Sequence, residues 1–159
     1  MRNITLWPWW RFLRAWLLTF TLASMSHTQF NLAQLSRVDI SVNLAQRLNM
    51  TSQDWLGLLP TYGVIIAVGL LLGWLICTAI LHFTDAKGTV AEVSYVLAGG
   101  IAIGVIHIAM YPILQVTLIA GARDFGLVLQ ILSGLIGACW FVYPKNLTYQ
   151  NITKTNNVK

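Results

Sequence analysis

The sequence predicts an all-α, polytopic membrane protein, a four-transmembrane-helix bundle with a short amphipathic segment between helices 1 and 2. Uncharged runs at about 56–81, 95–118 and 125–143 are each long enough to cross a hydrocarbon core of about 30 Å, and a weaker run lies at about 12–32. Only 9% of the 159 residues are charged and 57% are hydrophobic, whereas soluble domains average about 25% charged residues.

The weaker run at about 12–32 follows a basic start that contains Arg2, Arg11 and Arg14. Such a start is also typical of a secretory signal peptide, so a cleaved signal is the alternative interpretation. Because apolar character resumes at Phe30, we expect an uncleaved signal anchor that remains as the first span.

The segment before the second span predicts a surface helix. Ile40, Leu44 and Leu48 recur at four-residue spacing among polar residues, which is typical of an amphipathic helix lying on the outer surface of the membrane. Residues 51–54 (Thr-Ser-Gln-Asp) resemble a capping box, so we expect the helix of the second span to begin there. Pro60 falls beyond the first turn of that helix and is expected to kink it.

The last two spans are joined by the short segment 120–126, which predicts antiparallel neighbours. Residues 1–144 therefore form a single transmembrane domain. The tail at 145–159 is rich in Asn, Thr and Lys and is expected to be disordered.

Charge bias sets the expected orientation. With a cytoplasmic amino terminus, seven basic residues lie inside and three outside, namely Arg2, Arg11, Arg14, Lys87, Lys145, Lys154 and Lys159 against Arg37, Arg47 and Arg123. The positive-inside rule then predicts an inner (plasma) membrane protein with both termini in the cytoplasm. The net charge of +5 is explained by these flanking residues, so we expect no nucleic-acid partner.

Small residues predict how the helices pack. Interfaces between helices in lipid are enriched in Gly and Ala at four-residue spacing. Such pairs lie in the last three spans, at Gly69 and Gly73, Gly100 and Gly104, and Gly134 and Ala138. They indicate close packing, either within one chain or between copies and partners.

Polar side chains inside the spans define a candidate intramembrane pocket. Polar groups in hydrocarbon usually face the bundle interior or a water-filled cavity. The candidates are His107, Tyr111 and Gln115 on the third span, Ser24, His27, Thr28 and Asn31 on the first, and Gln130 on the fourth. They either bind a ligand or form a hydrogen-bond network that fixes helix register.

Several chemistries have no support in the sequence. No carboxylate lies within a span, which disfavours proton- or sodium-driven transport and carboxylate acid–base catalysis. Cys77 and Cys139 lack the spacing of metal ligands and are expected to be buried, unpaired hydrophobes. We therefore expect no catalytic residue, no metal and no cofactor.

The leading hypothesis is a non-catalytic accessory protein or complex subunit that packs through the small-residue faces. The expected partners are the lipid bilayer and a membrane protein or a second copy of the chain. One alternative is a small-solute or ion pathway lined by polar stripes of the first and third spans. Another is a quinone- or haem-binding redox subunit that uses His107 and Tyr111.

Overall fold

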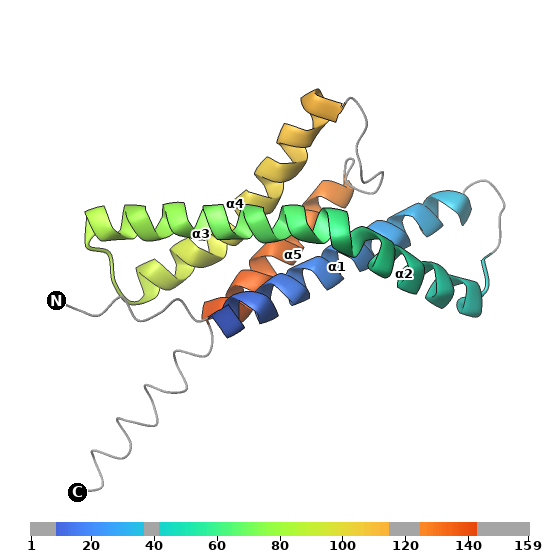
Figure 1. The fold of residues 1–159 in the computed structure, drawn as a ribbon, viewed down its shortest axis with the longest axis horizontal. Helices are drawn as coiled ribbons and strands as arrows, with labels where there is room; N and C mark the ends of the chain where they lie inside the picture. The colour runs from blue at the N-terminus through green and yellow to red at the C-terminus, as the bar shows by residue number, and fades with distance from the viewer. Residues whose placement is uncertain (1–8, 37–41, 115–124, 143–159) are drawn as a thin grey trace, which may run out of the picture.

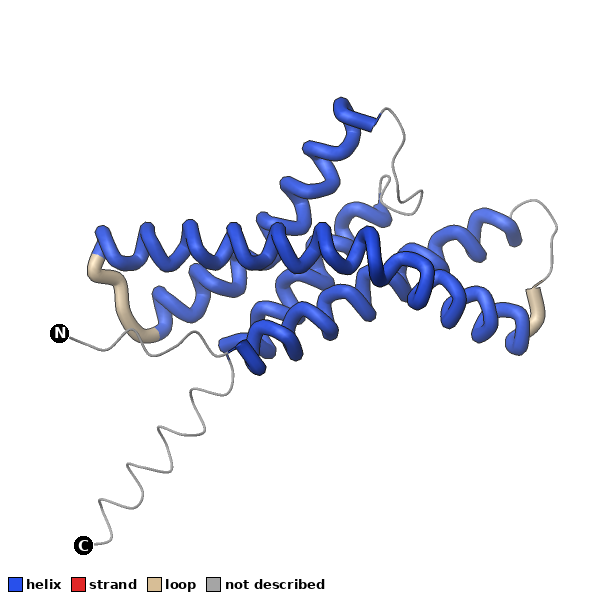
Figure 2. Tube along the Cα trace, in the orientation of Figure 1, coloured by secondary structure: helices blue, strands red, loops and turns tan. Residues whose placement is uncertain are grey.

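A computed structural model describes residues 9–36, 42–114 and 125–142, and all regular structure in these ranges is helical (Figures 1 and 2). The elements, in chain order, are α1 (Trp9–Ser36), α2 (Leu44–Leu58), the π-helix η1 (Leu59–Gly63), α3 (Val64–Thr84), α4 (Thr89–Leu114) and α5 (Phe125–Val142). The predicted all-helical fold is confirmed for this part of the chain. The predicted loop at 120–126 falls largely, and the tail at 145–159 wholly, outside the described residues.

Among the residues that the structure describes, three helical segments are long and apolar enough to cross a membrane: Leu44–Thr84, Thr89–Met110 and Phe125–Val142. These support a membrane protein. Helix α1 has sufficient length but is more polar, because it contains Arg11, Arg14 and many hydroxyl and amide side chains. The count of four spans therefore stays a prediction.

The predicted start of the second helix at residues 51–54 is wrong. The capping box lies earlier, where the Asn43 side chain accepts from the Gln46 backbone N–H (2.8 Å) and the Gln46 side chain accepts from the Asn43 N–H (3.0 Å). The Thr51 hydroxyl instead donates to the Arg47 carbonyl, one turn back in the same helix. The amphipathic segment is thus no separate surface helix: α2, η1 and α3 run on as one helical stretch of 41 residues.

Pro60 is accommodated by the π-helix η1. Proline has no backbone N–H and its ring crowds the preceding turn, and a π-turn is a common way to absorb such a disruption. The Gly63 carbonyl at the end of η1 accepts a hydrogen bond from the Trp16 indole of α1 (2.7 Å). Tyr62, which belongs to η1, is fully buried and points into the bundle.

Helix α5 packs against both α1 and α4, and α3 packs on α4 (Figure 1). Helix α2 packs against α1, and the two form a helical hairpin at one end of the molecule, here called the hairpin end. The α4–α5 contact is close because glycines meet there: a Cβ atom added to Gly134 would lie 2.6 Å from the Gly99 carbonyl oxygen.

Aromatic rings fill the core nearer the opposite end. The Trp74 ring of α3 stacks on Phe141 of α5 (centroids 4.2 Å apart) and meets Phe12 of α1 edge-on. The Trp74 indole also donates to the Tyr95 carbonyl of α4 (3.1 Å). We call Phe12, Trp74, Tyr95 and Phe141 the aromatic layer.

Candidate functional site

A chain of hydrogen bonds crosses the core between the aromatic layer and the hairpin end. The Tyr62 hydroxyl donates to Oε1 of Gln130 (2.9 Å) and lies 3.2 Å from Nε2 of His107. Nε2 of Gln130 donates to the Ala23 carbonyl (3.0 Å). These contacts join η1, α4, α5 and α1, and we call Tyr62, His107 and Gln130 the polar layer.

The donors and acceptors of the polar layer do not balance. The Ile103 carbonyl can only accept, so Nδ1 of His107, 2.8 Å away, carries the hydrogen and Nε2 of the neutral ring is an acceptor. The Gln130 amide is oriented by its bond to the Ala23 carbonyl, which leaves Oε1 facing Tyr62. The single Tyr62 hydrogen therefore has two acceptors, and Nε2 of His107 is the group left for an additional donor.

The surrounding helices hold the polar layer firmly. Tyr62 and Gln130 are both fully buried. The buried Ser133 hydroxyl, one turn along α5, donates to the Gln130 carbonyl (2.6 Å). In hydrocarbon no water can replace the hydrogen-bond partners of these groups. The polar layer therefore favours one relative position of the four helical segments that it joins.

A second polar cluster lies between α1 and α2. The Thr28 hydroxyl donates to Oδ2 of Asp54 (2.9 Å), and the Trp55 indole donates to the Thr21 hydroxyl (3.2 Å). Along α1, the Asn31 amide lies 3.1 Å from Nε2 of His27. These contacts fasten α2 to α1 at the hairpin end.

The predicted pocket residues thus fall into two groups rather than one pocket. His107 and Gln130 meet through Tyr62, whereas His27, Thr28 and Asn31 belong to the α1–α2 cluster. Ser24 is fully buried, and its hydroxyl has no hydrogen-bond partner within the described part of the chain. The Tyr111 side chain and all of Gln115 lie outside the described residues.

Tyr62 and Asp54 were missed by the sequence reasoning. The signal for Tyr62 was Pro60, because a proline in an uncharged run disturbs the helix and can turn a nearby side chain inward. Asp54 was assigned to a helix cap, although it lies inside a helix and accepts from Thr28. Neither contact follows from spacing alone, since each joins residues from different helices.

The predicted small-residue faces all contact other helices of the same chain. Gly69 faces Ile106 and Gly73 faces Ala102 across the α3–α4 contact. Across the α4–α5 contact, Gly100 faces Leu135, Gly104 faces Ile131, Gly134 faces Gly99 and Ile103, and Ala138 faces Gly99. A partner therefore needs a different surface.

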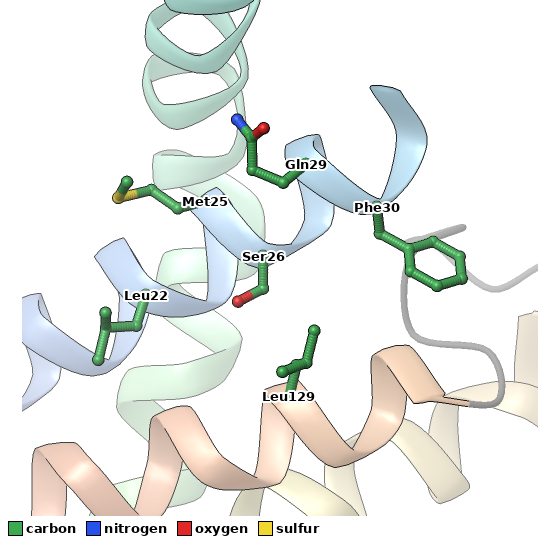
Figure 3. Close-up of a pocket in the computed structure, with 6 residues that line it drawn as sticks. All are labelled: Leu22, Met25, Ser26, Gln29, Phe30 and Leu129. Carbon is green, nitrogen blue, oxygen red and sulfur yellow. The ribbon is translucent and has the colours of Figure 1, made fainter. Parts of the chain in front are cut away.

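A groove lies on the described surface, between α1 and α5 (Figure 3). It has a volume of about 380 Å³ and is lined by Leu22, Met25, Ser26, Gln29, Phe30 and Leu129. In Figure 3, Leu129 of α5 points toward α1, whereas Gln29 points toward the other side of α1. The groove is mainly apolar and open.

Metal-binding side chains are sparse in the described ranges, which contain no group of three or more His, Cys, Asp or Glu side chains that could hold a metal ion. Both cysteines are free. Cys77 is buried as predicted, but the prediction for Cys139 is wrong, because its position on α5 is exposed.

Comparison of the chain with protein-family models, curated proteins and solved structures finds no match. The site must therefore be interpreted from its own geometry.

Proposed function

We propose that this small membrane protein is a non-catalytic accessory subunit that binds a partner membrane protein through the exposed face of α2. The observation that carries the proposal is the exposure of apolar side chains on that helix. Within the described structure, α2 has no buried residue, and Leu44 and Leu48 are 72% and 64% exposed. Leucines at this exposure on a helix outside the lipid core favour a protein contact.

The length of the rod formed by α2, η1 and α3 supports a position for α2 beyond the hydrocarbon. At about 1.5 Å per residue, its 41 residues extend about 60 Å, twice the thickness of a hydrocarbon core. The uncharged part begins at Trp55, and indole rings prefer the membrane interface. The preceding residues 44–54 include Arg47, Asp54 and several amides, which are costly in lipid.

The internal use of the small-residue faces also supports α2 as the docking surface. The glycines of α3, α4 and α5 already pack against helices of the same chain, so the surface left for a partner lies elsewhere. Exposed apolar side chains along α3, such as Leu72 and Ile76, are satisfied by lipid. The exposed leucines Leu44 and Leu48 of α2 lie outside the hydrocarbon in this proposal, so lipid does not cover them.

The solute-pathway alternative has weaker support. The polar residues of α1 contact α2 instead of facing a stripe on α4, and the aromatic layer fills the core on the other side of the polar layer. The redox alternative depends on Tyr111, whose side chain lies outside the described residues, and on His107, whose Nδ1 bonds to the Ile103 carbonyl and whose Nε2 lies 3.2 Å from the Tyr62 hydroxyl.

Site-specific photo-crosslinking in native membranes tests the proposal. A benzophenone amino acid replaces Leu48 on α2, and a matched variant carries it at Ile76 on α3, which is 60% exposed. We expect a discrete protein adduct from position 48 and lipid adducts from position 76. A position-48 variant that yields lipid adducts alone would place α2 on the membrane surface and contradict partner binding.

A further inference from the structure

The groove between α1 and α5 lies next to a cation. Nη1 of Arg47 donates to Oε1 of Gln29, which lines the groove, at a distance of 3.5 Å. Nε of Arg47 donates to the Val42 carbonyl, also at a distance of 3.5 Å. Both contacts are long and both acceptors are neutral, so neither offsets the positive charge of the guanidinium.

The level of this guanidinium relative to the membrane follows from the α1–α2 contacts. Gln29 also donates to the Thr51 hydroxyl (3.4 Å), so the groove residue and Thr51 lie at one level. Trp55 is four residues further along α2, and the indole of Trp55 bonds to Thr21. Arg47 is eight residues from Trp55, about 12 Å along α2, and its Nε lies 3.5 Å from the Val42 carbonyl, so the guanidinium stands on the headgroup side of the Trp55 indole.

We propose that this groove binds an anionic phospholipid, with the phosphate at Arg47 and an acyl chain against the apolar wall. Leu22, Met25 and Leu129 supply that wall. Gln29, which lines the side of the groove away from Leu129, contacts the guanidinium, and Ser26 adds a hydroxyl to the lining. An apolar wall with a cation at one side matches the acyl chain and the phosphate of an anionic lipid.

This inference is independent of partner binding by α2. The groove is formed by α1 and α5, whereas the exposed leucines lie on α2. Arg47 itself lies on α2, so Met25→Trp on α1 is the variant expected to lower lipid binding and leave partner binding in place.

Native mass spectrometry of the purified protein with added phosphatidylglycerol tests the proposal. Arg47→Gln removes the charge, and we expect it to lower the affinity for one bound lipid about fivefold, the equivalent of about 1 kcal/mol for one basic residue at a membrane surface. Met25→Trp adds bulk to the groove and is expected to lower the affinity as well. Phosphatidylcholine is expected to bind more weakly than phosphatidylglycerol, and inorganic phosphate to displace neither.

The matched controls remove a charge and add an indole elsewhere. Lys87→Gln changes an exposed cation that pairs with Asp85, and Leu72→Trp adds bulk to the exposed face of α3. Both are expected to retain the lipid as the unaltered protein does. Undiminished retention by either groove variant, or equal losses in the controls, would overturn the proposal.

Discussion

The aromatic layer and the polar layer hold the same helices together by different means. In the aromatic layer, Trp74 of α3 stacks on Phe141 of α5 and contacts Phe12 of α1. In the polar layer, the Tyr62 hydroxyl of η1 donates to Gln130 of α5 and lies 3.2 Å from Nε2 of His107 of α4. The first contact depends on the shapes of rings and the second on the pairing of donors with acceptors.

The difference shows how the membrane changes the weight of each contact. Lipid tails solvate a separated indole nearly as well as another helix does, so the aromatic layer gains stability from close fit and dispersion. A separated hydroxyl or amide has no water nearby, but other side chains in the membrane can replace its partner, so such bonds average only about 0.6 kcal/mol. We therefore expect ring packing to contribute more stability and the polar layer more specificity of register.

Trp74→Ala should give the largest loss. Replacing a buried Trp by Ala costs about 3–5 kcal/mol in soluble cores, and because lipid solvates the unfolded indole we expect about 3 kcal/mol here. Reversible unfolding in mixed micelles measures the change in free energy. Trp74→Phe keeps a ring and loses the bond to the Tyr95 carbonyl, so it should be milder. A loss no larger than that of Ile76→Ala, on the exposed face of the same helix, would refute the importance of the layer.

Gly134→Ala tests the α4–α5 contact that lies between the two layers. The new methyl group would meet the Gly99 carbonyl oxygen at 2.6 Å and Ile103 at 2.7 Å, and a backbone atom cannot move aside cheaply. We expect a loss of about 2 kcal/mol, within the usual cost of overpacking, in the same unfolding assay. The control is Gly57→Ala, where nothing lies within 4 Å and alanine should stabilise the helix slightly. Equal stabilities for the two variants would contradict this packing.

Tyr62→Phe removes the hydroxyl that joins the polar layer. Oε1 of Gln130 loses its donor, and we expect a loss of about 1 kcal/mol, between the average and the largest values for membrane hydrogen bonds. A double-mutant cycle with Gln130→Leu should give a non-zero coupling energy. Tyr95→Phe is the matched control, because that hydroxyl contacts the Thr78 hydroxyl at an exposed position. If the control costs as much as Tyr62→Phe, burial of the polar layer adds nothing.

Thr28→Val should give the smallest change. It keeps the side-chain shape but removes the donor to Asp54, so we expect a loss of about 0.6 kcal/mol in the free energy of unfolding. Ser52→Ala, which removes an exposed hydroxyl on α2, serves as the control. A loss greater than that of Tyr62→Phe would shift the main polar tie from the core to the hairpin end.

Much of the fold follows from hydropathy, and the polar contacts do not. The long uncharged runs predicted helices, and these ranges are helical. The packing role that spacing assigned to Gly69, Gly73 and Gly134 stays a prediction, although each of these glycines lies against another helix. The helix start at Leu44 was missed because the capping box has Asn43 at the N-cap in place of the usual Ser or Thr, with Gln46 at N3. Tyr62 was missed because its orientation depends on the π-turn at Pro60 and on partners from two other helices.

The proposed docking surface depends most on the helical stretch Leu44–Thr84 having its two ends in different surroundings, with α2 in water and α3 in lipid. Spin labels at positions 48 and 76, each in a Cys77→Ala, Cys139→Ala background reconstituted into liposomes, report this through relaxation by a water-soluble nickel chelate and by oxygen. We expect the label at position 48 to respond to the chelate and the label at position 76 to respond to oxygen. A stronger response to oxygen at both positions would put α2 in the bilayer and contradict the proposed docking surface.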